Sequence, residues 1–135
     1  MNEVLNDKNG NILNPKIPRY ERTILYKSQG TGTAGSFTLN DSIANYREIE
    51  INYHTNDNLF ETKEVTNPDG RSELNISISA FKTVSNNTYI KVREININGT
   101  QVTNNSAGEI TINPGGNPSQ TTSNYVYIDS VVGYK

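Results

Sequence analysis

The sequence predicts an all-β protein, an antiparallel β-sandwich of jelly-roll type with an extended N-terminal arm. Two observations lead to this fold class. From residue 22 onward, short runs of β-branched and aromatic residues recur at near-regular spacing, separated by clusters of Asn, Gly, Pro and Ser. No stretch shows helical periodicity over a useful length, so strands and helices do not alternate. We therefore do not expect a parallel α/β sheet.

The chain divides into two segments of different composition. Residues 1–21 are predicted to form an arm or linker, because residues 14–19 contain two prolines, which cannot donate to a strand ladder. Residues 22–135 are predicted to form the β-sandwich domain, which is of ordinary single-domain size.

The strands expected in the first half cover, in chain order, 23–27, 37–39, 46–54 and 59–66. The clearest alternation runs from Tyr46 to His54, with Ile49, Ile51 and Tyr53 inward and polar residues outward. Between these strands, 28–36 is a Gly/Thr/Ser loop that we expect to be flexible, and 40–45 is expected to form one capped turn. The strand 59–66 is more polar, as an edge strand would be.

The strands expected in the second half cover 74–79, 88–98, 100–103, 109–113 and 124–135. Asn98–Gly99 is a strong hairpin signal. The apolar phase changes between Val92 and Ile95, which indicates a β-bulge.

The last strand, 124–135, is expected to be central, because it carries apolar side chains on both faces. One face would then pack on the core, and the other would be covered as well or would face another subunit. Simple alternation assigns these faces as Tyr125, Tyr127 and Val131 against Val126, Ile128, Val132 and Tyr134.

Composition excludes several function classes. The net charge is -2 and no Lys/Arg cluster occurs, so we expect neither a nucleic-acid nor a membrane partner. With no cysteine, neither a disulfide framework nor a thiolate metal site can form. The N-terminus lacks the features of a signal peptide, which indicates synthesis in the cytoplasm without ordinary secretion.

Motifs for catalysis or cofactor binding are weak. Gly30 to Gly35 has the G-x-G-x-x-G spacing of dinucleotide sites, but strand-like residues follow it where a helix is required. Glu48 and Glu50 share a strand face and could serve a hydrolase, although no apolar pocket around them is evident. We therefore expect no catalytic residues, no metal, no cofactor and no enzymatic activity.

Tyrosine-containing strands with uncharged polar faces suit contact with sugars, and they suit a wet subunit interface equally well. Binding residues concentrate in loops held by a rigid scaffold. If a saccharide binds, the candidate carbohydrate-binding residues are those of two polar turns, namely His54, Asn56, Asp57, Asn58, Asn86 and Asn87.

Four blocks, TILY (23–26), FTLNDSIANYREIEINY (37–53), NTYIKVR (87–93) and YIDSVVGYK (127–135), resemble a C-terminal domain of minor structural proteins of phages and prophages of Gram-positive bacteria. That family includes tail-fibre, baseplate and head-fibre proteins. The resemblance covers about residues 22–135 and rests on strand cores plus a terminal signature, without a catalytic motif.

The resemblance implies a homotrimeric β-sandwich located in the virion. Its arm would contact other virion proteins, and the domain would contact host cell-wall saccharide as a receptor-binding module. Two alternatives remain, a monomeric carbohydrate-binding module or lectin, and a purely structural head or tail decoration protein without a receptor role.

Overall fold

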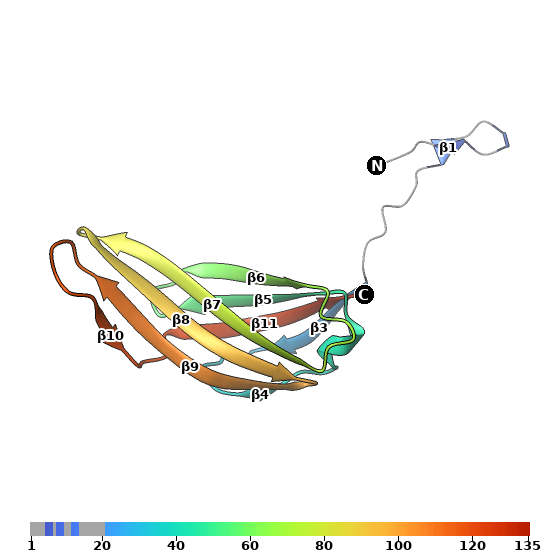
Figure 1. Ribbon diagram of the computed structural model, residues 1–135. Coiled ribbons are helices and arrows are strands. Elements are labelled where there is room, and N and C mark those ends of the chain that lie inside the picture. The colour runs from blue at the N-terminus through green and yellow to red at the C-terminus, as the bar shows by residue number, and fades with distance from the viewer. Residues whose placement is uncertain (1–4, 7, 10–11, 14–20) are drawn as a thin grey trace.

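The fold is an antiparallel β-sandwich, as the sequence predicts. The computed structural model describes residues 5–6, 8–9, 12–13 and 21–135. Two sheets pack face to face (Figure 1). The β8 sheet has the strand order β10-β9-β8-β7, with β4 also pairing with β9, and the β11 sheet has the order β3-β11-β5-β6.

The strands of the β11 sheet are β3 (Arg22–Lys27), β5 (Glu48–Thr55), β6 (Phe60–Thr66) and β11 (Val126–Tyr134). The β8 sheet contains β4 (Phe37–Thr38), β7 (Glu73–Val84), β8 (Asn87–Asn98), β9 (Gln101–Ile112) and β10 (Ser119–Thr121). The capped turn predicted at 40–45 is the 3-10 helix η1 (Ile43–Asn45), whose N-cap Ser42 accepts a hydrogen bond from the Ala44 amide.

Most of the arm lies outside the described residues. Within it the structure describes a short antiparallel pair, β1 (Leu5–Asn6) with β2 (Ile12–Leu13). The prolines of the arm belong to 14–20, outside the described part. Among the residues that the structure describes, none belongs to a helix with the length and apolar character of a transmembrane span.

The last strand is central, as predicted, because β11 pairs with β3 on one edge and β5 on the other. The predicted assignment of its faces is wrong after Ile128, because Val131 lies opposite Ile51 on the core face while Val132 and Tyr134 lie opposite Glu50 and Glu48 on the outer face. A bulge at Asp129 changes the phase, so that Val131 joins Val126 and Ile128 in the core and all three are fully buried. Alternation alone cannot predict such a shift, because a bulge adds one residue to one strand.

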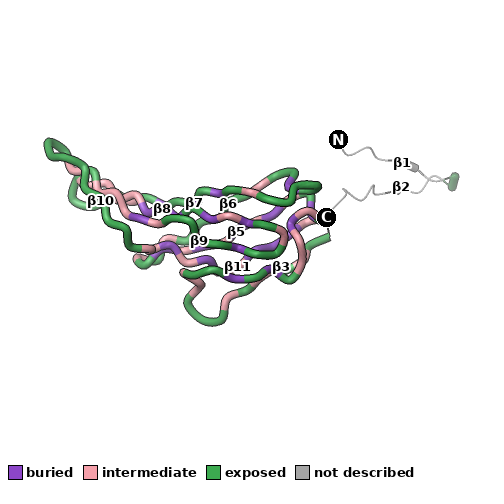
Figure 2. Tube along the Cα trace, turned by 60° about the horizontal axis from the view of Figure 1, so that its bottom comes forward, coloured by how far each residue is buried: buried purple, intermediate pink, exposed green. Residues whose placement is uncertain are grey.

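The core lies between the sheets, and Figure 2 shows buried residues interspersed with intermediate and exposed ones along the strands. Ile49, Ile51 and Tyr53 of β5 point into it, as their alternation predicts. Gly133 of β11 packs on the ring of Tyr46, where an added Cβ would lie 2.5 Å from the nearest ring carbon. The terminal signature therefore contains a glycine that makes room for a buried tyrosine.

Residues 101–112 form one strand, β9, whereas the sequence predicts two. Asn104, Asn105 and Ser106 interrupt the apolar alternation, yet the strand continues through them. The irregularity predicted in 92–95 is found between Glu94 and Ile95, but the extra residue belongs to β9. The β7 strand is likewise longer than predicted and runs to Val84.

The end of β7, the start of β8 and the end of β9 extend beyond the β11 sheet (Figure 1), and we call this part of the β8 sheet the overhang. In this overhang the usual polarity is reversed. The side facing the other sheet has Lys82, Lys91 and Glu109, while the outer side has Phe81 paired with Ile90, which in turn pairs with Ile110. Phe81 is 72 % exposed. The overhang therefore presents apolar side chains to solvent.

Candidate functional site

The outer face of the β11 sheet has an aromatic row across three strands. Tyr127 of β11 lies opposite His54 of β5, which lies opposite Phe60 of β6. The His54 ring is 5.1 Å from the ring of Phe60 and 5.4 Å from that of Tyr127, measured between centroids. Phe60 is 70 % exposed, so its ring is open to solvent, whereas the His54 side chain is 13 % exposed. We call these three residues the aromatic platform.

The bulge residue Asp129 sits beside the platform. His54 Nδ1 donates to its carboxylate, at 2.9 Å from Oδ1 and 2.8 Å from Oδ2. The side chain of His54 is 13 % exposed and that of Asp129 is 30 % exposed. The bond fixes the orientation of the imidazole ring and leaves part of the carboxylate able to accept further hydrogen bonds.

A row of uncharged polar side chains lies next to the aromatic platform on the same outer face, where Asn52 of β5 is two residues from His54. The Thr62 hydroxyl donates to Asn52 Oδ1 at 2.7 Å, and Asn52 Nδ2 donates to the Ser130 hydroxyl at 3.0 Å. A shallow cavity of about 300 Å³ lies between these polar side chains and the aromatic platform. It is lined by Asn52, Tyr53, Phe60, Glu61, Thr62 and Asp129.

This arrangement has the chemistry that a sugar requires. An exposed aromatic ring offers a flat apolar surface to the C–H face of a pyranose. Carboxylate, amide and hydroxyl groups at its border can bond the sugar hydroxyls and fix the orientation of the ligand. Because Phe60 and His54 stand on paired strands of one sheet, the platform is held by the scaffold itself.

The sequence-predicted turn residues Asn56 and Asp57 belong to a different place, the space beneath the overhang. Asp57 forms ion pairs with Lys82 and with Lys91, whose Nζ is 2.8 Å from Oδ2. Lys91 Nζ also donates to Asn56 Oδ1 at 2.7 Å and lies 3.6 Å from Glu109 Oε2. We call Asp57, Lys82, Lys91 and Glu109 the ion cluster.

The ion cluster is mostly shielded from water, since the side chain of Lys91 is 5 % exposed and that of Asp57 is 18 % exposed. Burial raises the pKa of Asp57, but the contacts with Lys82, Lys91 and Thr55 outweigh burial and hold this pKa below its ordinary value. A cavity of about 280 Å³ borders the cluster. Because its charges pair with one another, the cluster connects the β5–β6 turn of one sheet to the inner face of the other.

The remaining predicted residues lie in separate turns. Asn58 and Asn86 are exposed and have positive φ angles, 61° and 68°, which asparagine tolerates well in tight turns. Asn87 begins β8 at the tip of the β7–β8 hairpin. Of the predicted carbohydrate-binding residues, the structure therefore places His54 in the platform, Asp57 in the ion cluster, Asn56 beside that cluster, and the other three in turns.

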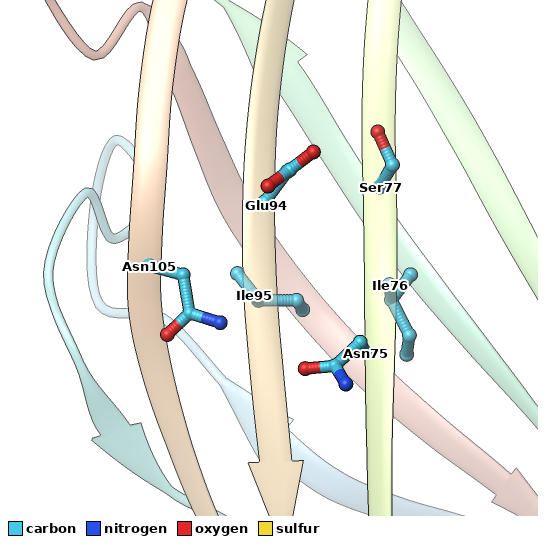
Figure 3. A pocket seen from close by; sticks show the side chains of 6 residues that line it. All are labelled: Asn75, Ile76, Ser77, Glu94, Ile95 and Asn105. Carbon is cyan, nitrogen blue, oxygen red and sulfur yellow. The ribbon is translucent and has the colours of Figure 1, made fainter.

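Another depression lies on the outer face of the β8 sheet (Figure 3). Its side chains come from three adjacent strands, with Asn75 and Ser77 on β7, Glu94 on β8 and Asn105 on β9. Ile76 and Ile95 complete the lining, and the volume is about 300 Å³. No aromatic ring lines this depression, so it lacks a stacking surface for a sugar.

Glu48 and Glu50, the residues of the hydrolase alternative, lie on the outer face with Glu64. The three carboxylates approach within 4.8 Å of one another, and Glu50 pairs directly with Glu64 across the strands. Glu64 is exposed and the other two are half-buried. An acid catalyst needs an apolar enclosure that raises its pKa, and the surroundings of these three carboxylates do not provide one.

Phe60, Tyr127 and Asp129 are absent from the sequence-predicted site. Phe60 could have been found, because a large aromatic residue in an otherwise polar edge strand is unusual. Tyr127 lies on a strand for which the sequence predicts that both faces are covered or contact another subunit. Alternation already places Asp129 on the Tyr127 face, but the sequence does not indicate that strand pairing brings this face beside His54.

Comparison with protein-family models finds no match for this chain. A search of curated proteins likewise finds no relative that meets the significance required.

Proposed function

We propose that this chain is a structural protein of a bacteriophage virion whose β-sandwich binds a saccharide of the host cell surface on the aromatic platform. The observation on which the binding role rests is the exposed ring of Phe60, stacked on His54 beside the carboxylate of Asp129. The resemblance of four sequence blocks to phage fibre and baseplate proteins supports the virion context.

Phe60 and Phe81 offer a matched pair of variants for testing the binding role. They are 70 % and 72 % exposed and stand on outer faces of different sheets. Soluble monovalent oligosaccharides released from Gram-positive cell walls would be titrated into wild-type, Phe60→Ala and Phe81→Ala protein, with chemical shifts recorded by NMR. Monovalent ligands make the result independent of assembly state.

We expect Phe60→Ala to weaken binding roughly tenfold or more, because an aromatic contact contributes about 1 kcal/mol beyond its buried area. Phe81→Ala should bind as the wild type does. Equal binding by both variants, or no wild-type binding at millimolar sugar, would refute the proposed receptor role and leave the structural alternative.

The proposal includes assembly as a homotrimer. The outer face of the overhang supports it, because Phe81 and Ile112 are 72 % and 43 % exposed and stand near Ile90 and Ile110. Contiguous apolar surface of this kind commonly marks a protein contact. Light scattering at micromolar concentration distinguishes this proposal from the monomeric lectin alternative, since a monomeric mass would contradict the trimer.

A further inference from the structure

The glycine-containing loop 28–36 lies directly against the aromatic platform. Gly32 has a φ of +93°, and a Cβ added to it would lie 2.7 Å from the Tyr127 Cβ, 3.0 Å from Asp129 Oδ1 and 3.0 Å from His54 Cε1. Glycine is the one residue without a Cβ, so this close approach depends on it. The spacing that resembles a dinucleotide motif thus belongs to a loop in contact with the candidate sugar site.

Backbone hydrogen bonds hold this loop along β11. The Ser28 amide donates to the Asp129 carbonyl at 2.8 Å. The Thr33 amide donates to the Ile128 carbonyl at 2.9 Å and the Ile128 amide donates back at 3.0 Å. The loop is therefore bonded on both sides of Gly32, in contrast to the flexible loop that the sequence predicts.

A buried arginine holds the same loop from the core. Arg93 of β8 is 0 % exposed. Its Nη1 donates to the Thr33 carbonyl at 2.7 Å and its Nη2 to the Gly35 carbonyl at 2.8 Å. Further bonds reach Asn104 Oδ1 at 2.7 Å and the Val126 carbonyl at 3.3 Å. The guanidinium thus crosses the sandwich to fix a loop on the opposite sheet.

The acceptors around Arg93 are three peptide carbonyls and one side-chain amide, all uncharged. Burial lowers the pKa of Arg93 to about 10, so the guanidinium is charged at neutral pH. A buried cation is costly unless its hydrogen bonds are satisfied. Its charge-assisted bonds to Thr33 and Gly35 are strong, which makes the loop position well defined.

We propose that loop 28–36 forms a wall of the saccharide site and that Arg93 is the positioning residue that holds this wall against the platform. The inference rests on the proposed function. Gln29 and Thr31 are exposed residues of the same loop, and Thr31 directly precedes Gly32. Their amide and hydroxyl groups favour a neutral, hydroxyl-rich pyranose as the ligand.

Two variants and a control outside the loop test the wall. Gly32→Ala places a methyl group against Tyr127 and strains the backbone, which displaces the loop. Phe81→Ala is the control, because Phe81 is exposed on the outer face of the other sheet. Arg93→Lys keeps the charge but loses the two-pronged contact to Thr33 and Gly35.

Affinity for the cell-wall oligosaccharides and amide hydrogen exchange would be measured for each variant. We expect Gly32→Ala and Arg93→Lys to weaken binding roughly tenfold, because a displaced loop would lose one or two hydrogen bonds to the ligand. The Thr33 amide should exchange faster in both, while β5 amides keep their protection. Phe81→Ala should match the wild type in both measurements.

The outcomes separate this inference from the proposed function. Faster Thr33 exchange with unchanged affinity would overturn the wall, and unchanged Thr33 exchange in folded Arg93→Lys would overturn the positioning role. Should Arg93→Lys fail to fold, Gly32→Ala decides on the wall by itself. If the wild type binds no saccharide while the Thr33 amide responds to Arg93→Lys as expected, the proposed function and the wall fail, and the positioning role of Arg93 stands.

Discussion

Replacing Lys91 with methionine should destabilise the sandwich more than any surface lysine substitution. Lys91 Nζ lies 2.8 Å from Asp57 Oδ2 and 2.7 Å from Asn56 Oδ1, and its side chain is 5 % exposed. Removing one partner of a buried ion pair costs about 3–5 kcal/mol, because the other charge stays buried without compensation. Lys82 also contacts Asp57. The remaining counter-charge places the expected loss at the lower end, about 3 kcal/mol.

Urea unfolding at pH 7 measures this loss, and thermal unfolding checks it. For a chain of this size, about 3 kcal/mol corresponds to roughly 10 °C in Tm. Lys63→Met on the exposed edge strand β6 is the control and should change stability by less than about 0.5 kcal/mol. In the double variant Asp57→Asn/Lys91→Met, the uncompensated carboxylate is gone. The double variant should lose less unfolding free energy than the two single variants lose in sum.

Two results would refute the reasoning. One is a Lys91→Met protein within about 1 kcal/mol of the wild type, which would mean that the cluster is effectively solvated. The other is strict additivity of the Asp57 and Lys91 substitutions, which would show that the two side chains do not interact in the native state.

Three further predictions concern stability. Gly133→Ala should cost about 1–3 kcal/mol, because its Cβ would overlap the buried Tyr46 ring, and urea unfolding near wild-type values would contradict this. Glu64→Lys should raise stability by about 0.2–1 kcal/mol in low salt, since Glu64 lies directly opposite Glu50, and a decrease would argue against repulsion there. The folded-state pKa of Asp57 is lowered, so its stabilisation is complete above the unfolded value of about 3.9 and is lost as pH falls through the folded value. Between pH 5 and pH 2, denaturation should therefore depend on pH less steeply in Asp57→Asn than in the wild type, and identical slopes would count against the lowered pKa.

Local pattern was enough to predict the sandwich and most of its strands. The alternation of Ile49, Ile51 and Tyr53 identified β5 and its buried face, and Asn98–Gly99 located the β8–β9 hairpin. The merged strand β9 was missed because polar residues at 104–106 resemble a loop when their partners are unknown. The strand bulge at Asp129 was missed because nothing in the local sequence marks it.

The candidate site was less predictable for a related reason. His54 was identified, but its neighbours Phe60 and Tyr127 reach it through cross-strand pairing that spans different parts of the chain. The adjacent residues Asn56 and Asp57 turn away toward Lys91. Polar turn residues are plausible ligand contacts in any β-sandwich, and strand pairing decides which of them share a surface with an aromatic ring.

The central position of β11 has a consequence for biogenesis. The strands that flank it, β3 and β5, are synthesised long before residues 126–134, and each must wait for β11 with an unpaired edge toward it. Pairings of such large sequence separation fold slowly. The nascent domain should therefore pass through a state in which the β11 position between β3 and β5, the open slot, is empty, and any other extended chain could pair there. Yield on expression should accordingly rise when synthesis is slowed or the temperature is lowered, because fewer chains then meet while the slot is open.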